Sequence, residues 1–238
     1  QRLIRNNAEI AVRKAISKIK NSEILYPMDD DLNGGKRQIK IKLSIDKKKN
    51  CAEIDFTGTT NELESNYNAP LPVTSAAVLY SFRILTGGNI PMNSGIMRPI
   101  KIKIPSRTML SPKYPAAVIA GNVETSQAVT TALLMCFGIQ AASQSTMNNI
   151  TWGNQHFQYY ETICGGTGAG IDFSGEFYDG TSAVHSHIVK VERDGAQKTG
   201  TAVRTVVPMW GTNARFFAMM AKEYYEHPDD SPIDPNSD

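Results

Sequence analysis

A strict alternation of apolar and polar side chains between residues 39 and 45 constrains the fold of this chain more than any other feature. The two sets occupy alternate positions, Ile39, Ile41, Leu43 and Ile45 against Lys40, Lys42 and Ser44. Successive side chains of a strand point to opposite faces, so this pattern predicts a strand that is buried on one face only. The polar run at 47–49 and a second apolar run at 52–56 follow, which predicts an antiparallel hairpin with the lysines at its tip.

Helical spacing predicts three helices around this hairpin. Residues 4–19 have an apolar and a basic face, and residues 72–85 start with a proline and precede a glycine pair. The longest candidate is 123–142, with Asn122 as its cap and Glu124 in its first turn. We expect a loop at 26–35, strands at 100–104, 157–163 and 202–207, and a helix at 210–226. The mixture predicts an α+β fold with mixed, largely antiparallel sheets and packed helices, rather than a doubly wound parallel sheet.

Composition excludes several classes of protein. The 25 basic and 23 acidic residues nearly cancel, so no basic face for nucleic acid is expected. No apolar stretch reaches the roughly 18 residues of a membrane span. The 3 cysteines lie far apart and show no metal-ligand spacing, which favours a reduced, cytoplasmic protein. The phosphate-binding pattern Gly-x-x-x-x-Gly-Lys-Ser/Thr is absent, so the sequence itself offers no such nucleotide site.

Four polar segments in the middle of the chain are richer in glycine and amide side chains than a hydrophobic core requires. They are 55–59 with 66–70, 120–127, 143–149 and 160–170. Glycine lets backbone N–H groups approach a ligand, and amides donate and accept hydrogen bonds, which suits a carbonyl, an amide or a carboxyphosphate. The structural alternatives are an Asx turn at Asn66 and Asn68 and a plain flexible loop at 165–170.

Two features indicate proton transfer or metal binding. His185 and His187 would share one face of a strand, so that both imidazoles could reach one metal ion or substrate. Glu161, beside the glycine-rich segment, could serve as a base or a metal ligand. For the two histidines, the alternative is a pair of ordinary surface or hydrogen-bonded side chains.

The order of these motifs resembles the hydantoinase B/oxoprolinase family, whose members include 5-oxoprolinase, N-methylhydantoinase and the acetone and acetophenone carboxylases. The resemblance covers residues 4 to 188, and its motifs are at 54–59, 68–70, 90–95, 98–100, 121–127, 142–144, 147–149, 159–162, 165–170 and 182–187. It implies a hetero-oligomer in which a hydantoinase A-type partner binds ATP and phosphorylates the small-molecule substrate. The B-type subunit then processes the activated carbonyl, with a divalent metal (Mg, Mn or Zn) as a further cofactor whose ligands are unassigned.

The resemblance and the polar segments together give one set of expected site residues. We expect catalysis from Glu161, His185 and His187. We expect substrate binding from Asn68, Gly121, Asn122, Glu124, Gln144, Asn148, Asn149, Gly165, Gly166 and Gly168. The expected reaction is ATP-dependent opening of a lactam or hydantoin. The alternatives are a subunit of a ketone carboxylase and an assembly subunit without chemistry of its own.

The chain departs from the family pattern at both ends. Members of the family carry a long segment before the point that corresponds to residue 1, so this chain is expected to be the C-terminal half of a B-type subunit that requires the missing half as a partner. The pair of histidines continues with Ile188-Val189-Lys190-Val191 instead of Met-Thr-Asn-Thr. We therefore expect a family region at 1–188, a divergent strand–helix extension at 189–226 and a disordered tail at 227–238.

Overall fold

The computed structural model describes residues 1–28, 37–87, 90–146, 148–155, 158–163, 166–171, 175–180, 183–185 and 205–207, with the backbone alone in the strands at 148–153, 158–163, 183–185 and 205–207. The chain divides into two units. The first contains residues 1–146 and 169–178, and the second contains residues 147–168 and 179–238. The first unit is therefore discontinuous in sequence.

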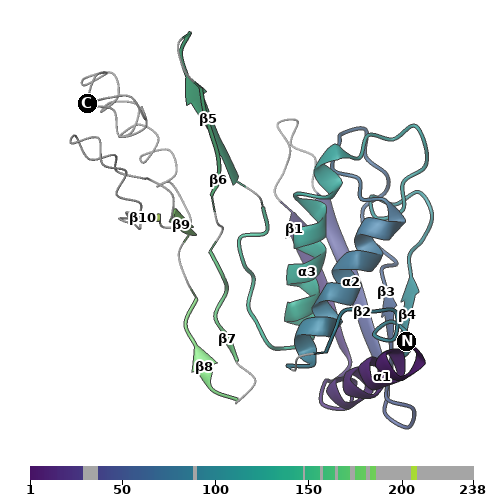
Figure 1. Ribbon diagram of the computed structural model, residues 1–238. Helices are drawn as coiled ribbons and strands as arrows, with labels where there is room; N and C mark the ends of the chain where they lie inside the picture. Colours follow the sequence, from purple (N-terminus) through teal and green to yellow (C-terminus); the bar gives the residue numbers. More distant parts are fainter. Residues whose placement is uncertain are drawn as a thin grey trace. The chain divides into compact units, whose positions relative to one another are not determined.

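A four-stranded sheet in the order β1-β2-β3-β4 forms the centre of the first unit (Figure 1). Its strands are β1 (Ser22–Met28), β2 (Arg37–Asp46), β3 (Cys51–Asp55) and β4 (Ile100–Lys103). β2 pairs antiparallel with β1 and β3, with Leu43 opposite Ile54, which confirms the predicted hairpin. β3 pairs parallel with β4, with Ile54 opposite Ile102. The sheet is thus mixed, as the α+β prediction requires.

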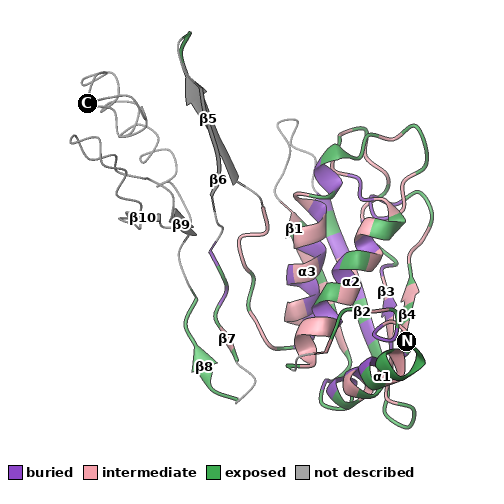
Figure 2. Ribbon diagram, in the orientation of Figure 1, coloured by how far each residue is buried: buried purple, intermediate pink, exposed green. Residues whose placement is uncertain are grey.

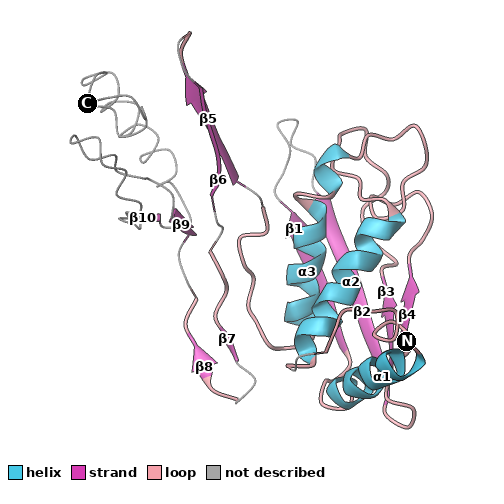
Figure 3. Ribbon diagram, viewed as in Figure 1, coloured by secondary structure: helices cyan, strands magenta, loops and turns pink. Residues whose placement is uncertain are grey.

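Helices α1 (Arg2–Ile16), α2 (Leu71–Leu85) and α3 (Thr125–Cys136) cover the apolar face of this sheet (Figures 1 and 3). α2 connects the parallel strands β3 and β4, which makes β3-α2-β4 a crossover unit. The core lies between the sheet and the helices (Figure 2). At its centre the ring of Phe82 on α2 meets the ring of Phe137 edge to face, with 4.9 Å between their centroids and 72° between their planes.

The opposite face of the sheet carries a row of alternating charges. In register across the four strands lie Glu23, Lys42, Asp55 and Lys103. Three ion pairs join neighbouring strands on this face, Lys40–Glu23 at 2.9 Å, Lys101–Glu53 at 2.9 Å and Lys103–Asp55 at 2.8 Å. Opposite charges on adjacent strands stabilise a sheet face that stays in contact with water.

α3 is shorter than the predicted helix 123–142, because Gly138 ends it. Gly138 has a left-handed φ of +71°, and its N–H donates to the carbonyl of Met135. The next N–H, of Ile139, donates to the carbonyl of Leu134. This pair of bonds is the Schellman pattern that closes a helix C-terminus. The predicted cap was also wrong: Glu124 occupies the N-cap, and Asn122 follows the short 3-10 helix η1 (Ile119–Gly121).

Two of the longer strands were missed by the sequence patterns. β1 was predicted to be partly loop, because Pro27 interrupts it and proline cannot donate a ladder hydrogen bond. As the first strand of the sheet, β1 has one free edge, where a proline is tolerated. The other missed strand is β5 (Asn148–Gly153), which is rich in asparagine and therefore reads as polar loop.

The second unit contains two antiparallel strand pairs. β5 pairs with β6 (Gln158–Ile163), and β9 (Ala183–His185) pairs with β10 (Thr205–Val207). The short pair β7 (Gly170–Ile171) and β8 (Phe177–Tyr178) belongs to the first unit, where Gly170 also bridges Gln140. The predicted helix at 210–226 and the tail at 227–238 lie outside the described residues. Across the described ranges, no helix has the length and apolar character needed to cross a membrane.

Candidate functional site

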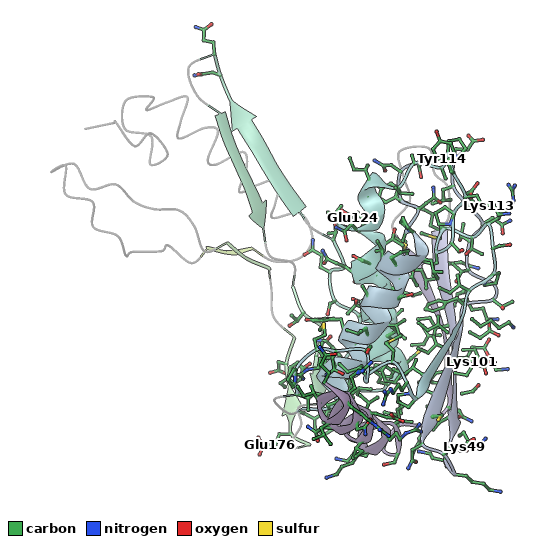
Figure 4. All side chains as sticks on the ribbon, turned by 45° about the vertical axis from the view of Figure 1, so that its right-hand side comes forward. Lys49, Lys101, Lys113, Tyr114, Glu124 and Glu176 are labelled. Atoms are coloured by element: carbon green, nitrogen blue, oxygen red, sulfur yellow. The ribbon has the colours of Figure 1, made fainter. Side chains whose placement is uncertain are left out.

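The crossover β3-α2-β4 fixes one edge of the first unit as the candidate site. Because β3 and β4 are parallel, both end at this edge, and the loops that follow them occupy it. In open sheets with parallel strands, ligands bind outside the carboxyl ends of the strands. We define the carboxyl edge as the loops 56–70 and 104–124 together with the segment 143–146. Lys113, Tyr114 and Glu124 lie toward this end of the unit, whereas Lys49 at the tip of the hairpin lies toward the other (Figure 4).

Asn68 holds the first of these loops together. Its side chain is fully buried, and its Oδ1 accepts the N–H of Leu63 at 2.8 Å. Its Nδ2 donates to the carbonyls of Leu63 at 2.9 Å, Ser65 at 3.0 Å and Ala117 at 3.0 Å. Backbone groups thus occupy the whole amide. The Asx turn that the sequence offered as an alternative does not describe these bonds, because the Oδ1 of Asn68 accepts an N–H five residues earlier in the chain rather than two residues later.

Gly121 allows the second loop to approach the first. A Cβ atom at this position would lie 2.1 Å from the carbonyl oxygen of Asn68 and 2.8 Å from the Cα atom of Ala69. On either side of this contact, the N–H of Ala120 donates to the carbonyl of Asn66 at 2.9 Å, and the hydroxyl of Thr125 donates to the carbonyl of Tyr67 at 2.5 Å. The glycine therefore serves the packing of two backbones, and the start of α3 is tied to the loop that precedes α2.

Glu124 connects the start of α3 to the segment 143–146. At the N-cap of α3 its carboxylate makes no capping hydrogen bond. Its Oε1 instead accepts a hydrogen bond from the Thr146 hydroxyl at 2.6 Å. The neighbouring Ser145 hydroxyl lies 2.5 Å from that of Thr131 and accepts the Tyr26 hydroxyl at 3.1 Å. Gln144, a predicted substrate ligand, is half-buried within this anchored segment.

The surface of the carboxyl edge combines amide and aromatic side chains. Asn66 and Asn122 are exposed, and Tyr114 and Ile119 are 99% and 78% exposed. The guanidinium of Arg37, which is buried, lies 3.8 Å from the centre of the Tyr67 ring in the loop 56–70. An edge with two helix N-termini, exposed amides and a buried cation suits a small anionic or carbonyl-bearing ligand.

The predicted site residues of the second unit lie mainly on the β5–β6 hairpin. Its register places Asn148 opposite Ile163, Asn149 opposite Thr162 and Glu161 opposite Ile150, so the hairpin brings these three predicted residues together at one end. Gly166 and Gly168 are buried. His185 pairs with Thr205 of β10. The remaining predicted residues, Gly165 and His187, lie outside the described ranges.

No metal centre is assigned within the described part of the chain. There, no group of three or more histidine, cysteine, aspartate or glutamate side chains comes together in a way that could hold a metal ion.

The motif at 54–59 forms a turn that returns the chain from β3 to β2. The Thr59 hydroxyl accepts the N–H of Lys40 at 3.0 Å and donates to its carbonyl at 3.2 Å. Asp55 accepts the N–H of Thr57 at 2.8 Å and the ammonium of Lys103 at 2.8 Å. Burial by itself would raise the pKa of Asp55, but the bonds from Lys103 and Thr57 outweigh it and lower the pKa to about 2. The contacts of this motif stabilise the fold and hold the start of the loop 56–70 against β2.

Replacing Asp55 by asparagine is expected to lower the free energy of unfolding by about 1–2 kcal/mol at neutral pH, since Lys103 is half-exposed and solvent weakens the pair. The folded-state pKa lies below the ordinary value, so the carboxylate stabilises the protein above about pH 4 and loses this effect as pH falls toward 2. Urea unfolding of both proteins between pH 2 and 7 measures the difference. The matched control is Glu53→Gln, which removes the more exposed pair with Lys101 and should cost less than about 1 kcal/mol. A wild-type advantage that did not shrink in acid would contradict this account.

Sequence reasoning missed the residues that organise the carboxyl edge. Thr146 lies 22 positions from Glu124, and Arg37 lies in a strand distant in sequence from Tyr67. No local pattern encodes either pair. The packing role of Gly121 was detectable in principle, because an isolated glycine just before a helix often marks a close backbone approach.

Comparison with known proteins connects this geometry to a family. The hydantoinase B/oxoprolinase family model matches residues 2–194. The chain is 42% identical over 190 residues to a 5-oxoprolinase of Dictyostelium discoideum, covering 78% of this chain and 14% of that protein. It is 43% identical over 194 residues to 5-oxoprolinase 1 of Arabidopsis thaliana, covering 76% of this chain and 15% of that protein. It thus spans only about a seventh of the length of these relatives.

Solved structures share the fold. An ATP-dependent caprolactamase from Pseudomonas jessenii superimposes with a TM-score of 0.56 at 16% identity, covering 73% of this chain and 32% of that one. A nucleotide-free acetone carboxylase superimposes with a TM-score of 0.54 at 14% identity, covering 74% and 27%. The family match extends over most of the chain, and the resemblance expected from the motifs is confirmed. The chain belongs to the hydantoinase B/oxoprolinase family.

Proposed function

We propose that this chain is the B-type portion of an ATP-dependent enzyme that opens a lactam or a related cyclic amide. The observation that carries the proposal is the identity of more than 40% to proteins named 5-oxoprolinase, over a region that includes both the carboxyl edge and the β5–β6 hairpin. ATP would be bound by a hydantoinase A-type portion of the assembly, as the family resemblance implies. The phosphate-loop pattern is absent from this sequence, which is consistent with that division.

The proposed chemistry begins with a lactam whose carbonyl oxygen has received the γ-phosphoryl group of ATP. Water adds to this carbon, and the tetrahedral intermediate collapses with cleavage of the C–N bond, which leaves an acyl phosphate on the opened chain. A second water then hydrolyses the acyl phosphate to a carboxylate and free phosphate. The developing negative charge requires hydrogen-bond donors, and the departing nitrogen requires a proton. We assign the first task to backbone N–H groups at 165–168 and the second to Glu161 or to His185 and His187.

We propose a smaller set of substrate ligands than the sequence suggested. Asn122, which is exposed at the carboxyl edge, and the amides of Gln144, Asn148 and Asn149 remain proposed contacts for the phosphorylated substrate. Asn68 and Gly121 belong to the scaffold beneath the edge, since their contacts are with backbone groups of the first unit. We assign Glu124 a different role, which rests on its hydrogen bond with the Thr146 hydroxyl.

The proposal is tested by ATP hydrolysis in the assembly that contains this chain. Release of ADP is measured with 5-oxoproline or hydantoin and with acetone or acetophenone, each with and without bicarbonate. We expect release that needs the lactam and is independent of bicarbonate. Release that needs a ketone together with bicarbonate would assign the chain to the carboxylases instead.

A role in chemistry is separated from a role in assembly by two substitutions in the hairpin. We expect Glu161→Gln to reduce turnover at least 10-fold, because removal of a positioned proton-transfer group typically costs a factor of about 10²–10⁴. We expect Asn148→Ala to reduce turnover at least 10-fold as well, because it removes a proposed hydrogen bond to substrate. In both variants the assembly should keep its size. Turnover is measured alongside size-exclusion chromatography. Full turnover in both variants would show that this chain supports the enzyme only as a structural component.

A further inference from the structure

We propose that Glu124 is a positioning residue, which holds Thr146 and thereby fixes the segment that leads into the Asn148-Asn149 strand. The inference deepens the proposed function, because it concerns how those two amides are presented to substrate. It assigns to Glu124 a role other than the substrate contact expected from the sequence.

The Glu124 carboxylate binds a residue outside its own helix. A carboxylate at a helix N-cap ordinarily accepts a hydrogen bond from the second or third N–H of the helix. Glu124 makes no such bond, and Oε1 accepts the Thr146 hydroxyl at 2.6 Å instead. That distance is typical of a hydroxyl bound to an ionised carboxylate, which is a strong class of hydrogen bond. One oxygen of this carboxylate is therefore bound to the segment 143–146.

The segment 143–146 is also held through Ser145, the residue before Thr146. The Ser145 hydroxyl lies 2.5 Å from the Thr131 hydroxyl on α3 and accepts the Tyr26 hydroxyl from β1 at 3.1 Å. Two consecutive residues are thus bound to α3 and the sheet by side chains. Nothing in the hydrophobic core requires this, because the segment itself contributes no buried apolar residue.

The Glu124–Thr146 hydrogen bond lies just before the strand that contains Asn148 and Asn149. Thr146 ends the first of the two stretches that make up the first unit, and Asn148 begins β5 two residues later. The latch, which we define as the Glu124–Thr146 hydrogen bond, therefore holds the chain where it first leaves this unit. A reacting group displaced by about 1 Å can lose a factor of 10² in rate, so the conformation of the chain just before Asn148 and Asn149 bears on how these two amides meet substrate.

The experiment compares four variants in the intact assembly. Glu124→Ala and Thr146→Val each remove the latch, whereas Glu124→Gln and Thr146→Ser each keep an acceptor or a hydroxyl. The first readout is hydrogen–deuterium exchange of peptides spanning 137–150, which does not depend on activity. We expect exchange in this region to increase about 10-fold in the first pair and to stay near wild type in the second.

The second readout is steady-state turnover with its pH profile. We expect kcat to fall about 10- to 100-fold in Glu124→Ala and Thr146→Val, and the double variant to be no worse than Glu124→Ala. Glu124→Gln should recover most of the turnover with an unchanged pH profile. The matched control is Glu53→Gln, which removes a surface ion pair on the open face of the sheet, outside the carboxyl edge, and should leave both readouts at wild type.

Two outcomes would overturn the proposal. The first is Glu124→Gln being as inactive as Glu124→Ala while Thr146→Val stays active, because a charge acting directly on substrate would then be required. The second is unchanged exchange at 137–150 in all four variants. If the assembly shows no lactam-dependent ATP hydrolysis, the proposed function fails, whereas the exchange measurement still decides whether the latch exists.

Discussion

Replacing Asn68 by alanine is expected to lower the free energy of unfolding by about 4 kcal/mol, a large effect for one polar side chain. The amide satisfies one backbone N–H and three carbonyls in a site with no exposed surface. Each lost hydrogen bond costs about 1 kcal/mol, and a buried group left without a partner costs more. Urea unfolding followed by circular dichroism measures the loss.

Two further variants make the Asn68 result specific. Asn68→Asp keeps the shape but points a carboxylate oxygen at the carbonyls of Ser65 and Ala117, and it should be at least as destabilising as alanine. Asn66→Ala, on the exposed side of the same loop, should change stability by less than about 0.5 kcal/mol. A stable Asn68→Ala protein with impaired substrate binding would restore the ligand role predicted from the sequence.

Replacing Gly121 by alanine should be similarly damaging, at about 3 kcal/mol or more, and for a steric reason. The added Cβ would meet the Asn68 carbonyl oxygen at 2.1 Å, and the obstacle is backbone that cannot rotate away. The loops of the carboxyl edge would have to separate, so the variant should also lose turnover. Thermal unfolding and turnover of the same preparation check both expectations.

Gly138→Ala is the matched control for Gly121→Ala. Gly138 has φ of +71° and nothing within 4 Å of an added Cβ, so alanine there incurs only backbone strain of about 1 kcal/mol. If the two variants were equally stable, the close approach of the two loops would not be a determinant of the fold.

The parts of the fold that were predictable are those with a local period. Ile39, Ile41 and Leu43 alternate along β2 and proved to be buried, and the hairpin with β3 followed from them. β1 was not predictable in full because Pro27 is disfavoured in strands in general and tolerated only at an edge, a property of the finished sheet. The end of α3 depends on Gly138, and a glycine at the end of a helical pattern is itself a local signal of a helix C-terminus.

The sequence predicted which segments meet at the carboxyl edge, but it did not predict what each residue contacts there. Asn68, Gly121, Asn122 and Glu124 do come together at one edge. However, their neighbours in space, such as Ala117 and Thr146, are separated from them by tens of positions in the sequence. Whether an amide contacts a ligand or a backbone carbonyl depends on those neighbours. Residue type and spacing alone therefore cannot distinguish a scaffold residue from a ligand.

The alternating row of Glu23, Lys42, Asp55 and Lys103 on the open face of the sheet has a consequence for how this protein meets other molecules. Neighbouring charges of opposite sign cancel each other's field within a few ångströms, so this face exerts no long-range attraction on an approaching partner. Any protein that docked there would have to strip water from four charges at once. Association rates governed by this face would thus vary little with ionic strength, and a partner that associates faster at low salt must be approaching by another route.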